Sequence, residues 1–167
     1  MGLYYMTNKK EVEYYLGIAK AVAFKSTCTR RKFGAIIIMN GAIVSAGYNG
    51  SARKTINCGK EIPCIKDLYG EGSNVSYNYC PGIHAEQNAI INAARNGVGI
   101  WGATLFLAPA ENISGDRPCY LCRRAAINAG IEGCYYVGKG GNIIHEDIKY
   151  WIDLEDLWMK KQLMEQR

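Results

Sequence analysis

The stretch that decides the fold runs from residue 84 to residue 137 and reads HAEQNAIINAARNGVGIWGATLFLAPAENISGDRPCYLCRRAAINAGIEGCYYV. Its two helical patterns, residues 84–96 and 119–129, are each followed by a glycine, which commonly stops a helix. Its two apolar runs, residues 104–108 and 134–137, read as short buried strands. The stretch therefore predicts helix, strand, helix and strand in succession.

The residues before this stretch add one helix and two strands. Residues 8–24 carry apolar side chains at helical spacing, with Thr7 or Asn8 as a candidate N-cap. Residues 34–39 and 42–46 are apolar runs rich in β-branched residues. They are joined by Asn40-Gly41, a strong signal for a two-residue hairpin turn.

The residues after it predict a turn, a short strand and a terminal helix. Residues 138–141 form the turn, residues 142–145 the candidate strand, and Asp147 or Asp153 the start of the helix. We expect that helix, within residues 146–167, to bury an apolar face made by Trp151, Leu154, Leu157, Trp158 and Met159. The complete order of elements predicts a three-layer α/β/α domain around a mixed β-sheet.

Composition places the chain among soluble globular proteins with a single domain, residues 1–167. The 167 residues are 49% hydrophobic and 21% charged. No apolar run approaches the roughly 20 residues that a membrane-spanning helix needs, and the first six residues do not resemble a signal peptide. We expect a cytoplasmic protein with no membrane partner. The net charge of +5 is modest and dispersed, which does not favour nucleic acid as a partner.

The chain has seven cysteines, an odd number that fits a closed disulfide framework poorly. Without a secretory signal, reduced thiols are the better default. Reduced cysteines in pairs and clusters point toward bound metal.

Three residues form a candidate catalytic metal site: His84, Cys119 and Cys122. His84 begins one predicted helix, and the Cys-x-x-Cys pair begins another directly after Pro118. Two helix starts that follow loops can converge on one metal ion. A catalytic zinc takes three protein ligands and keeps a fourth position for water, whose pKa it lowers toward neutrality.

Glu86 follows His84 by two residues and can approach that water without binding the metal, which suits a proton shuttle. Taken singly, each residue has another interpretation: a structural histidine, a redox or structural Cys-x-x-Cys pair, or a glutamate that complements a helix dipole. The conjunction of His-x-Glu with Pro-Cys-x-x-Cys is a signature of zinc deaminases. The alternative function is a zinc-stapled binding module that has lost catalysis. Glu86 argues against it, because a purely structural metal site does not need a carboxylate beside an open coordination position.

The sequence resembles the cytidine and deoxycytidylate deaminase superfamily over roughly residues 10 to 140, and within it the deoxycytidylate (dCMP) deaminases most. The resemblance rests on the two metal motifs and on three further stretches. These are Ser26-Thr27-Cys28-Thr29-Arg30 with Gly34-Ala35, Gly47-Tyr48-Asn49-Gly50-Ser51, and Asn128-Ala129-Gly130-Ile131. It implies a cytidine-deaminase-like fold and the hydrolysis of dCMP to dUMP with release of ammonia.

The resemblance also implies residue roles. Zinc would bind His84, Cys119 and Cys122, with Glu86 as the catalytic acid and base. Four residues are implied at the substrate: Asn49 at the sugar or base, Arg30 near the phosphate, Tyr136 as a further candidate, and Ala85. From the residues alone, Asn49 could equally be a turn residue in a left-handed conformation.

Residues 51–83 lack clean periodicity and contain three of the cysteines, which favours a functional loop. Cys28, Cys58, Cys64 and Cys80 resemble a second, structural zinc site of many dCMP deaminases, able to pin this loop. Buried thiols without metal are the alternative. Cys134 is most simply a small apolar core residue.

Two departures from the family pattern bear on substrate and assembly. Residues 109–117 are inserted before Pro118, where relatives often have Ser or Phe, and the tail after Gly138 lies outside the resemblance. The substrate could therefore be a modified cytosine nucleotide, or a base in nucleic acid such as a tRNA adenosine. Relatives assemble into hexamers and often respond to dCTP and dTTP, which implies a homo-oligomer with these nucleotides as effectors.

Overall fold

The computed structural model describes residues 8–68, 80–111 and 117–165. In chain order the elements are α1 (Lys9–Ala23), β1 (Phe33–Met39), β2 (Ala42–Tyr48), β3 (Gly50–Ser51), α2 (Ile65–Leu68), β4 (Gly82–Ile83), α3 (Ala85–Arg95), β5 (Thr104–Pro109), α4 (Tyr120–Asn128), β6 (Gly133–Val137), the 3-10 turn η2 (Lys139–Gly141), β7 (Ile143–Asp147) and α5 (Ile148–Glu165).

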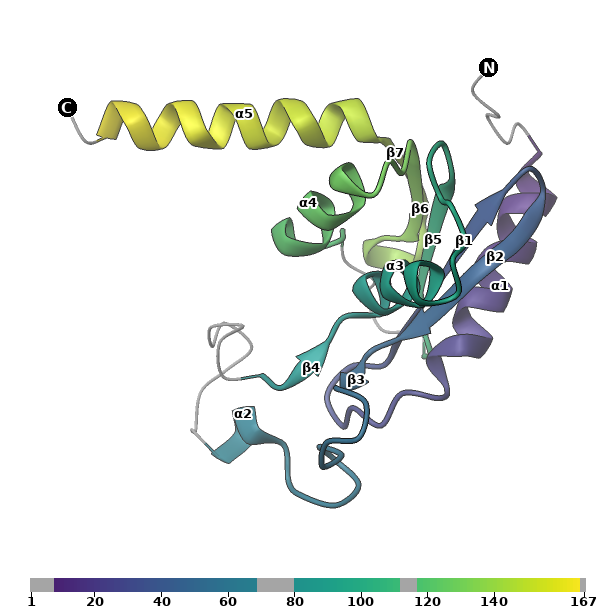
Figure 1. Cartoon of the computed structure of the whole chain (residues 1–167), viewed down its shortest axis with the longest axis vertical. Helices are drawn as coiled ribbons and strands as arrows, with labels where there is room; N and C mark the ends of the chain where they lie inside the picture. Colours follow the sequence, from purple (N-terminus) through teal and green to yellow (C-terminus); the bar gives the residue numbers. More distant parts are fainter. Residues whose placement is uncertain (1–7, 69–79, 112–116, 166–167) are drawn as a thin grey trace.

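Five strands form one mixed sheet in the order β2-β1-β5-β6-β7. The β5–β6 pair is parallel and is connected through α4, whereas the other neighbouring pairs are antiparallel. Strands β3 and β4 form a separate two-stranded ribbon beside the sheet (Figure 1). The predicted mixed sheet is confirmed, and the candidate strand at residues 142–145 exists as β7.

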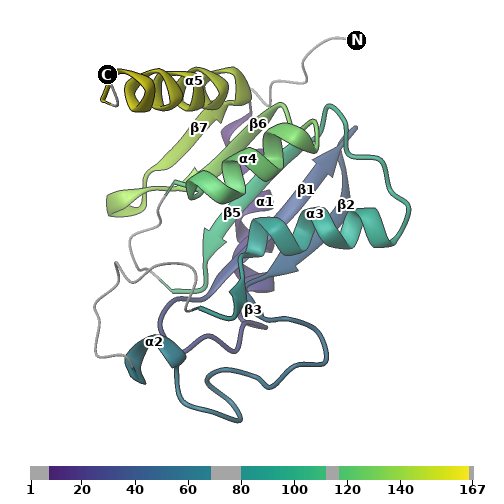
Figure 2. The same cartoon turned by 60° about the vertical axis from the view of Figure 1, so that its left-hand side comes forward.

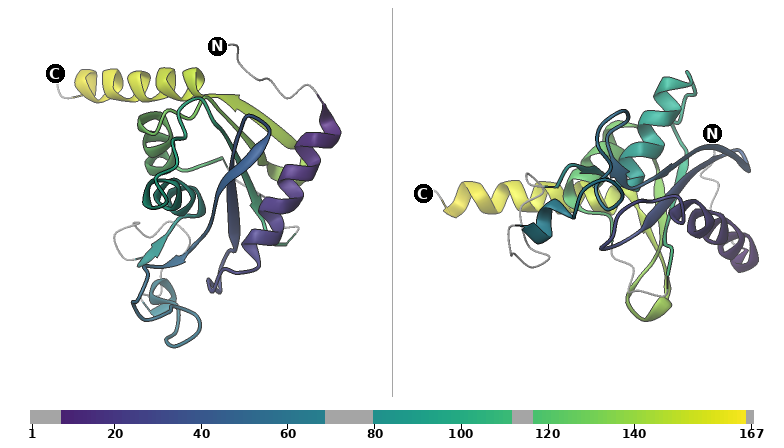
Figure 3. Two further views of the ribbon diagram at one scale, coloured as in Figure 1. Left: turned by 45° about the vertical axis from the view of Figure 1, so that its right-hand side comes forward. Right: turned by 90° about the horizontal axis from the view of Figure 1, so that it is seen from below.

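Helices cover both faces of this sheet, as the predicted α/β/α layering requires (Figures 2 and 3). Helix α1 covers one face and buries Leu16 and Ala19 against Ile36 and Phe106. Helices α3 and α4 cover the other face, where alanines of α3 pack on Ile37, Leu105 and Cys134. Cys134 is a fully buried core residue, as expected.

The β1–β2 hairpin turns at Asn40 and Gly41, whose φ angles are 51° and 75°. Both are left-handed, the conformation that this two-residue turn requires. Helix α3 then lies very close to β2, because a Cβ atom on Gly47 would come within 2.3 Å of the Ala89 nitrogen. This close approach fixes the start of α3 against the sheet.

Two predicted helices differ in detail. Helix α4 begins at Tyr120 with Cys119 as an extended N-cap, so Pro118 lies before the cap and not at the first helical position. Helix α5 begins after Asp147, whose carboxylate accepts a hydrogen bond from the Lys149 nitrogen. Of the expected apolar face, Trp151 is buried, while Leu157, Trp158 and Met159 are 65%, 51% and 48% exposed.

The remaining predictions concern loops. The part of residues 51–83 that the structure describes contains β3, α2 and β4, so it has more regular structure than the sequence indicated. Residues 69–79, residues 112–116 of the insertion and the N-terminal residues 1–7 lie outside the described residues. None of the described helices combines the length and the apolar character needed to cross a membrane.

Candidate active site

Two helix starts on one face of the sheet bring three potential metal ligands together. His84 is the N-cap of α3, Cys119 is the N-cap of α4, and Cys122 lies in the first turn of α4. The His84 Nδ1 atom lies 3.5 Å from the Cys119 Sγ and 3.3 Å from the Cys122 Sγ. Among the described residues, these three form the metal-ligating group whose ligand atoms all lie within 4.8 Å of one another.

This group fits a zinc ion. Tetrahedral zinc with its usual bond lengths to sulfur and nitrogen separates those two ligand atoms by roughly 3.5 Å, in agreement with the distances here. Hydrogen bonding from Cys122 lowers the pKa of Cys119 to about 3 and raises the pKa of Cys122. One thiolate, the form that binds metal, is therefore stabilised within the group.

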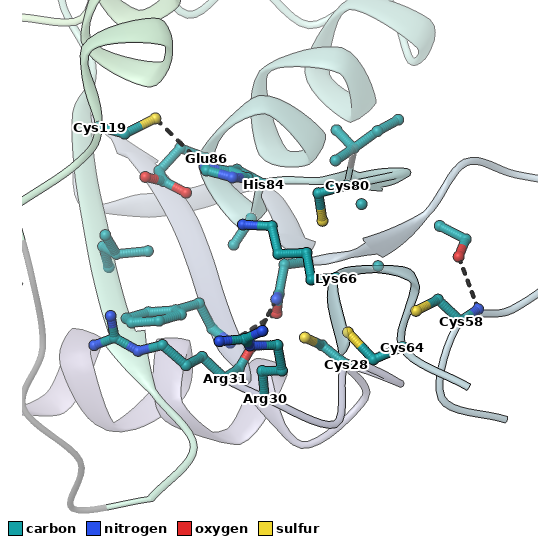
Figure 4. Close-up of a pocket in the computed structure, with 18 of the residues that line it drawn as sticks. Cys28, Arg30, Arg31, Cys58, Cys64, Lys66, Cys80, His84, Glu86 and Cys119 are labelled. Atoms are coloured by element: carbon teal, nitrogen blue, oxygen red, sulfur yellow. Dashed lines mark hydrogen bonds between the residues drawn. The ribbon is translucent and has the colours of Figure 1, made fainter. Parts of the chain in front are cut away.

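Glu86 lies beside this group, in the first turn of α3 (Figure 4). Its side chain is 4% exposed, and burial raises the pKa of its carboxyl group. It also interacts with the Cys122 thiol. A buried carboxyl group with a raised pKa next to a metal position is suited to accept a proton and return it.

A cavity of about 390 Å³ opens onto His84, Glu86 and Cys119 (Figure 4). This volume is in the range of small-molecule sites in proteins. Ala85, predicted at the substrate, lines the cavity from the first residue of α3, and apolar walls come from Phe33 and Leu107. The cavity therefore combines a candidate metal, a proton shuttle and space for a flat ring.

Asn49 lines the cavity and holds one of its walls. Its Oδ1 accepts a hydrogen bond of 2.8 Å from the Phe33 nitrogen, and its Nδ2 donates one of 2.8 Å to the Arg31 carbonyl. It is not among the residues with left-handed backbone. Asn49 is thus a clip that fixes residues 31–33 at the cavity, with one amide hydrogen left to donate.

Two arginines line the cavity away from the metal group, whereas the Lys66 amine lies near His84 (Figure 4). Arg30 is one of these two arginines, and its Nη1 donates to the Asp67 carboxylate at 3.0 Å. Arg31 and Lys66 also line the cavity, with the Arg31 guanidinium 5.2 Å from the Phe33 ring centroid. Arg31 directly follows the predicted Arg30 in the sequence, whereas no sequence signal identified Phe33 or Lys66.

Tyr136 lies elsewhere than the resemblance implied. It is 4% exposed, does not line the cavity, and donates its hydroxyl hydrogen to Glu146 at 2.9 Å. The cavity is instead lined by Arg117, which the sequence did not single out. Arg117 binds the same carboxylate, with its Nη2 2.7 Å from Glu146 Oε1. The sequence feature that could have identified Arg117 is its position directly before the Pro-Cys-x-x-Cys motif.

The four remaining predicted ligands gather at one side of the cavity. Cys28, Cys58, Cys64 and Cys80 all line it, and their sulfurs lie on neighbouring loops (Figure 4). The Cys58 pKa is raised by burial and also by hydrogen bonding with Cys64 and the proximity of Cys28. The four sulfurs are not drawn together as closely as the His84 group. The second zinc site therefore stays a prediction.

The sequence model for the cytidine and deoxycytidylate deaminase zinc-binding region matches residues 9–138. The chain belongs to this family. The match spans α1 to β6, and so includes both metal motifs, Glu86 and the clip residue Asn49. On its C-terminal side the family match of this deaminase ends just after β6, and β7 and α5 follow outside it.

Curated relatives agree with the assignment. The chain is 33% identical over 129 residues to the deoxycytidylate deaminase of Mycobacterium phage D29, covering 74% of this chain and 91% of the relative. It is 30% identical to ComE operon protein 2 of Bacillus subtilis and to the deoxycytidylate deaminase of Saccharomyces cerevisiae. In each case the match covers 74% of this chain, but only 57% and 36% of those longer relatives.

A solved structure is similar in sequence and fold. The dCMP deaminase of cyanophage S-TIM5, crystallised in complex with dCMP and dUMP, is 30% identical, with a TM-score of 0.59. The match covers 78% of this chain and 82% of the phage chain. A cytidine deaminase from Burkholderia pseudomallei has the same TM-score at 19% identity, which shows the shared fold.

Proposed function

We propose that this deaminase hydrolyses dCMP to dUMP and ammonia with zinc held by His84, Cys119 and Cys122. The observation that carries the proposal is one cavity in which this ligand group and buried Glu86 face two cationic side chains, Arg30 and Arg31 (Figure 4). A base at the metal end and a phosphate at the cationic end match a nucleoside monophosphate. The named dCMP deaminases among the relatives support the same substrate.

The chemistry divides between the metal and the chain's own residues. Zinc, when bound, supplies the Lewis acidity that makes a water nucleophilic near neutral pH. Glu86 accepts the proton from the water that attacks C4 of the cytosine and delivers a proton to N3. It then carries the second proton to the leaving amine, so that water and dCMP are converted to dUMP and ammonia.

The other lining residues bind and orient the nucleotide. Phe33 and Leu107 supply apolar surface for the ring. Asn49, through its clip on residues 31–33, holds the wall from which Arg31 projects. Asp67 orients Arg30 through an ion pair. Because this pair is open to solvent, the Arg30 guanidinium can also bind a phosphate. A charge-assisted contact to the phosphate contributes about 1.5–3 kcal/mol.

A substrate panel tests the proposal. Ammonia release should be far faster with dCMP than with deoxycytidine, cytosine-containing single-stranded DNA or adenosine in tRNA. Because about 1.4 kcal/mol corresponds to a factor of ten, Arg30→Ala should raise KM for dCMP roughly tenfold or more. The same change should leave the weak turnover of deoxycytidine nearly unaltered. Equal kcat/KM for dCMP and deoxycytidine would refute the phosphate contact, and preferred turnover of an oligonucleotide would refute the substrate.

We also propose a second, structural zinc at Cys28, Cys58, Cys64 and Cys80. Their shared position at the loop side of the cavity supports it, as does the preference of structural zinc for four thiolates. Elemental analysis of metal-replete protein should give two zinc ions per chain, and Cys58→Ser should remove one. A single zinc in well-folded, metal-replete protein would refute this site.

We propose further that the protein acts in the cytoplasm as a homo-oligomer that responds to dCTP or dTTP. None of the seven cysteines forms a disulfide, which supports a reducing compartment. Large exposed apolar side chains on α5, with Leu163 and Met164 67% and 75% exposed, support self-association. Light scattering with and without each nucleotide tests the assembly, and a monomer under all conditions would contradict it.

A further inference from the structure

Three arginines flank the Pro118–Cys122 motif, and each is paired with a carboxylate from the end of the chain. Arg117 directly precedes the motif and binds Glu146 of β7. Arg123 and Arg124 directly follow it and bind Glu155 of α5. The family match ends at residue 138, so both carboxylates come from outside the shared zinc-binding region.

The Glu146 contact holds the entry to the motif. The Arg117 Nε and Nη2 lie 2.8 Å and 2.7 Å from Glu146 Oε1. The carboxylate itself is 8% exposed and is fixed by two further donors, the Tyr136 hydroxyl at 2.9 Å and the Trp151 Nε1 at 2.6 Å. Since Trp151 is fully buried, Glu146 is a rigid anchor for Arg117.

The Glu155 contact holds the exit. Glu155 lies 2.7 Å from the Arg124 Nε and 3.4 Å from the Arg123 Nη2. Arg123 also donates from its Nη1 to the Pro118 carbonyl at 3.0 Å, which links Glu155 to the backbone just before Cys119. The Arg123 and Glu155 side chains are only 16% and 13% exposed, so each depends on the other for its charge.

Aromatic rings complete both contacts. The Arg117 guanidinium lies 5.4 Å from the centroid of the Tyr150 ring of α5. The Arg124 guanidinium lies 5.2 Å from the Tyr120 ring and 5.0 Å from the Trp158 ring. Tyr120 stands between the two cysteine ligands, so Trp158, Arg124 and Tyr120 connect α5 to the motif itself.

We propose that β7 and α5 position the two cysteine ligands of the zinc, with Glu146 and Glu155 as positioning residues. The histidine ligand is held mainly by α3 on β2, and α3 also packs against α4. The contacts of Glu146 and Glu155 fix the Pro118–Cys122 segment from the opposite side, and so help to keep the cysteine ligands at their distance from His84. The inference rests on the proposed zinc at His84, Cys119 and Cys122.

The rate of zinc release to a chelator tests this role, measured at 25 °C on the full-length, zinc-loaded protein. Loss of a residue that orients metal ligands typically weakens metal binding about 10–100-fold. Glu155→Gln, which preserves shape, should accelerate release of the zinc bound at the His84 group about tenfold or more. Glu165→Gln is the matched control, because it removes an exposed carboxylate of the same helix that pairs only along α5. It should leave the rate unchanged.

A coupled variant separates positioning from general stability. Arg124→Gln combined with Glu155→Gln should accelerate zinc release by less than the product of the two single effects, because the two changes share the Arg124–Glu155 contact. Trp158→Leu, at a half-exposed position, should accelerate release several-fold without unfolding the protein, which keeps the test valid if Glu155→Gln does not fold. An unchanged rate of zinc release in the folded Glu155→Gln and Trp158→Leu variants would refute the positioning role and leave the proposed function untouched. Absence of this zinc from the unaltered protein would refute the proposed function instead.

Discussion

The side chain of Glu86 is enclosed by the starts of two helices, with the candidate metal ligands on one side and the cavity on the other. Its carboxylate is 4% exposed, and burial raises its pKa. The two neighbouring ligands, His84 and Cys119, are N-caps, so their side chains leave the helices at the positions where the backbone is still extended. These three side chains thus meet although they come from two separate segments, the starts of α3 and α4.

Replacing Glu86 by Gln should abolish turnover while zinc content and fold remain. The amide keeps the shape of the side chain but cannot take up the proton, and loss of one acid–base group typically costs about 10²–10⁴-fold in rate. Ammonia release and elemental analysis on the same sample measure both effects. Loss of zinc would place Glu86 among the ligands, and near-normal turnover would remove it from the mechanism.

Replacing Asn49 by Ala should both destabilise the protein and weaken nucleotide binding. Two hydrogen bonds to the backbone at Arg31 and Phe33 are lost, and leaving such groups unsatisfied costs about 1–3 kcal/mol. Asn49→Asp is the matched variant, because it keeps the acceptor for the Phe33 nitrogen. Its stability should lie between those of the unaltered protein and the Ala variant. Urea unfolding and KM for dCMP measure the outcome. A normal KM in the Ala variant would show that the clip does not serve the cavity.

Among the elements, the contact between β2 and α3 is the tightest for the site, because it fixes the helix that begins with His84. A Cβ atom on Gly47 would lie 2.3 Å from the Ala89 nitrogen and 2.6 Å from the Ala85 carbonyl oxygen. Both neighbours are backbone atoms, so relief requires that α3 move away from the sheet.

Gly47→Ala should therefore lower stability by about 1–3 kcal/mol, the usual cost of overpacking, and reduce zinc affinity as His84 shifts. Gly17→Ala provides the contrast. Its Cβ would meet nothing within 4 Å on the exposed side of α1, so the same substitution should raise stability by about 0.5–1 kcal/mol. Thermal unfolding of the two variants checks the opposite signs. Equal effects would contradict the packing argument.

The elements that the sequence predicted well are those whose pattern is local. The spacing in α1, the Asn40-Gly41 turn and the alternation of strands and helices each follow from neighbouring residues. Helix α5 differed because apolar spacing shows which residues share a side and not what covers them. Trp158 lies over Arg124, a partner 34 positions earlier that no periodicity reveals.

The candidate site was predictable to the same extent. His84, Cys119, Cys122 and Glu86 are identified by their chemistry at short spacing, and the structure brings them together. The position of Tyr136 could not be predicted from the sequence. Its hydroxyl binds Glu146, which also binds Arg117, and both partners come from other segments of the chain. The same dependence on distant contacts concealed Lys66 and Phe33.

At the scale of the whole molecule, metal binding and folding are coupled, because the ligands come from two helices on one sheet. Excess zinc should raise the melting temperature of metal-free protein, with about 2.7 kcal/mol gained at a zinc concentration 100 times the Kd. The Glu86→Gln variant should gain as much as the unaltered protein, whereas His84→Ala should lose the part due to the catalytic site. A gain that survives in His84→Ala would show that zinc stabilises the protein elsewhere.

The placement of β5 ties the metal group to the middle of the sheet. This strand lies between β1 and β6 and separates His84 from Cys119 along the chain. Because β6 joins β5 in parallel, the crossover between them carries α4 and with it Cys122. Both halves of the metal group therefore depend on a strand that is paired on each side, so an exposed edge strand could fray without separating His84 from the two cysteines.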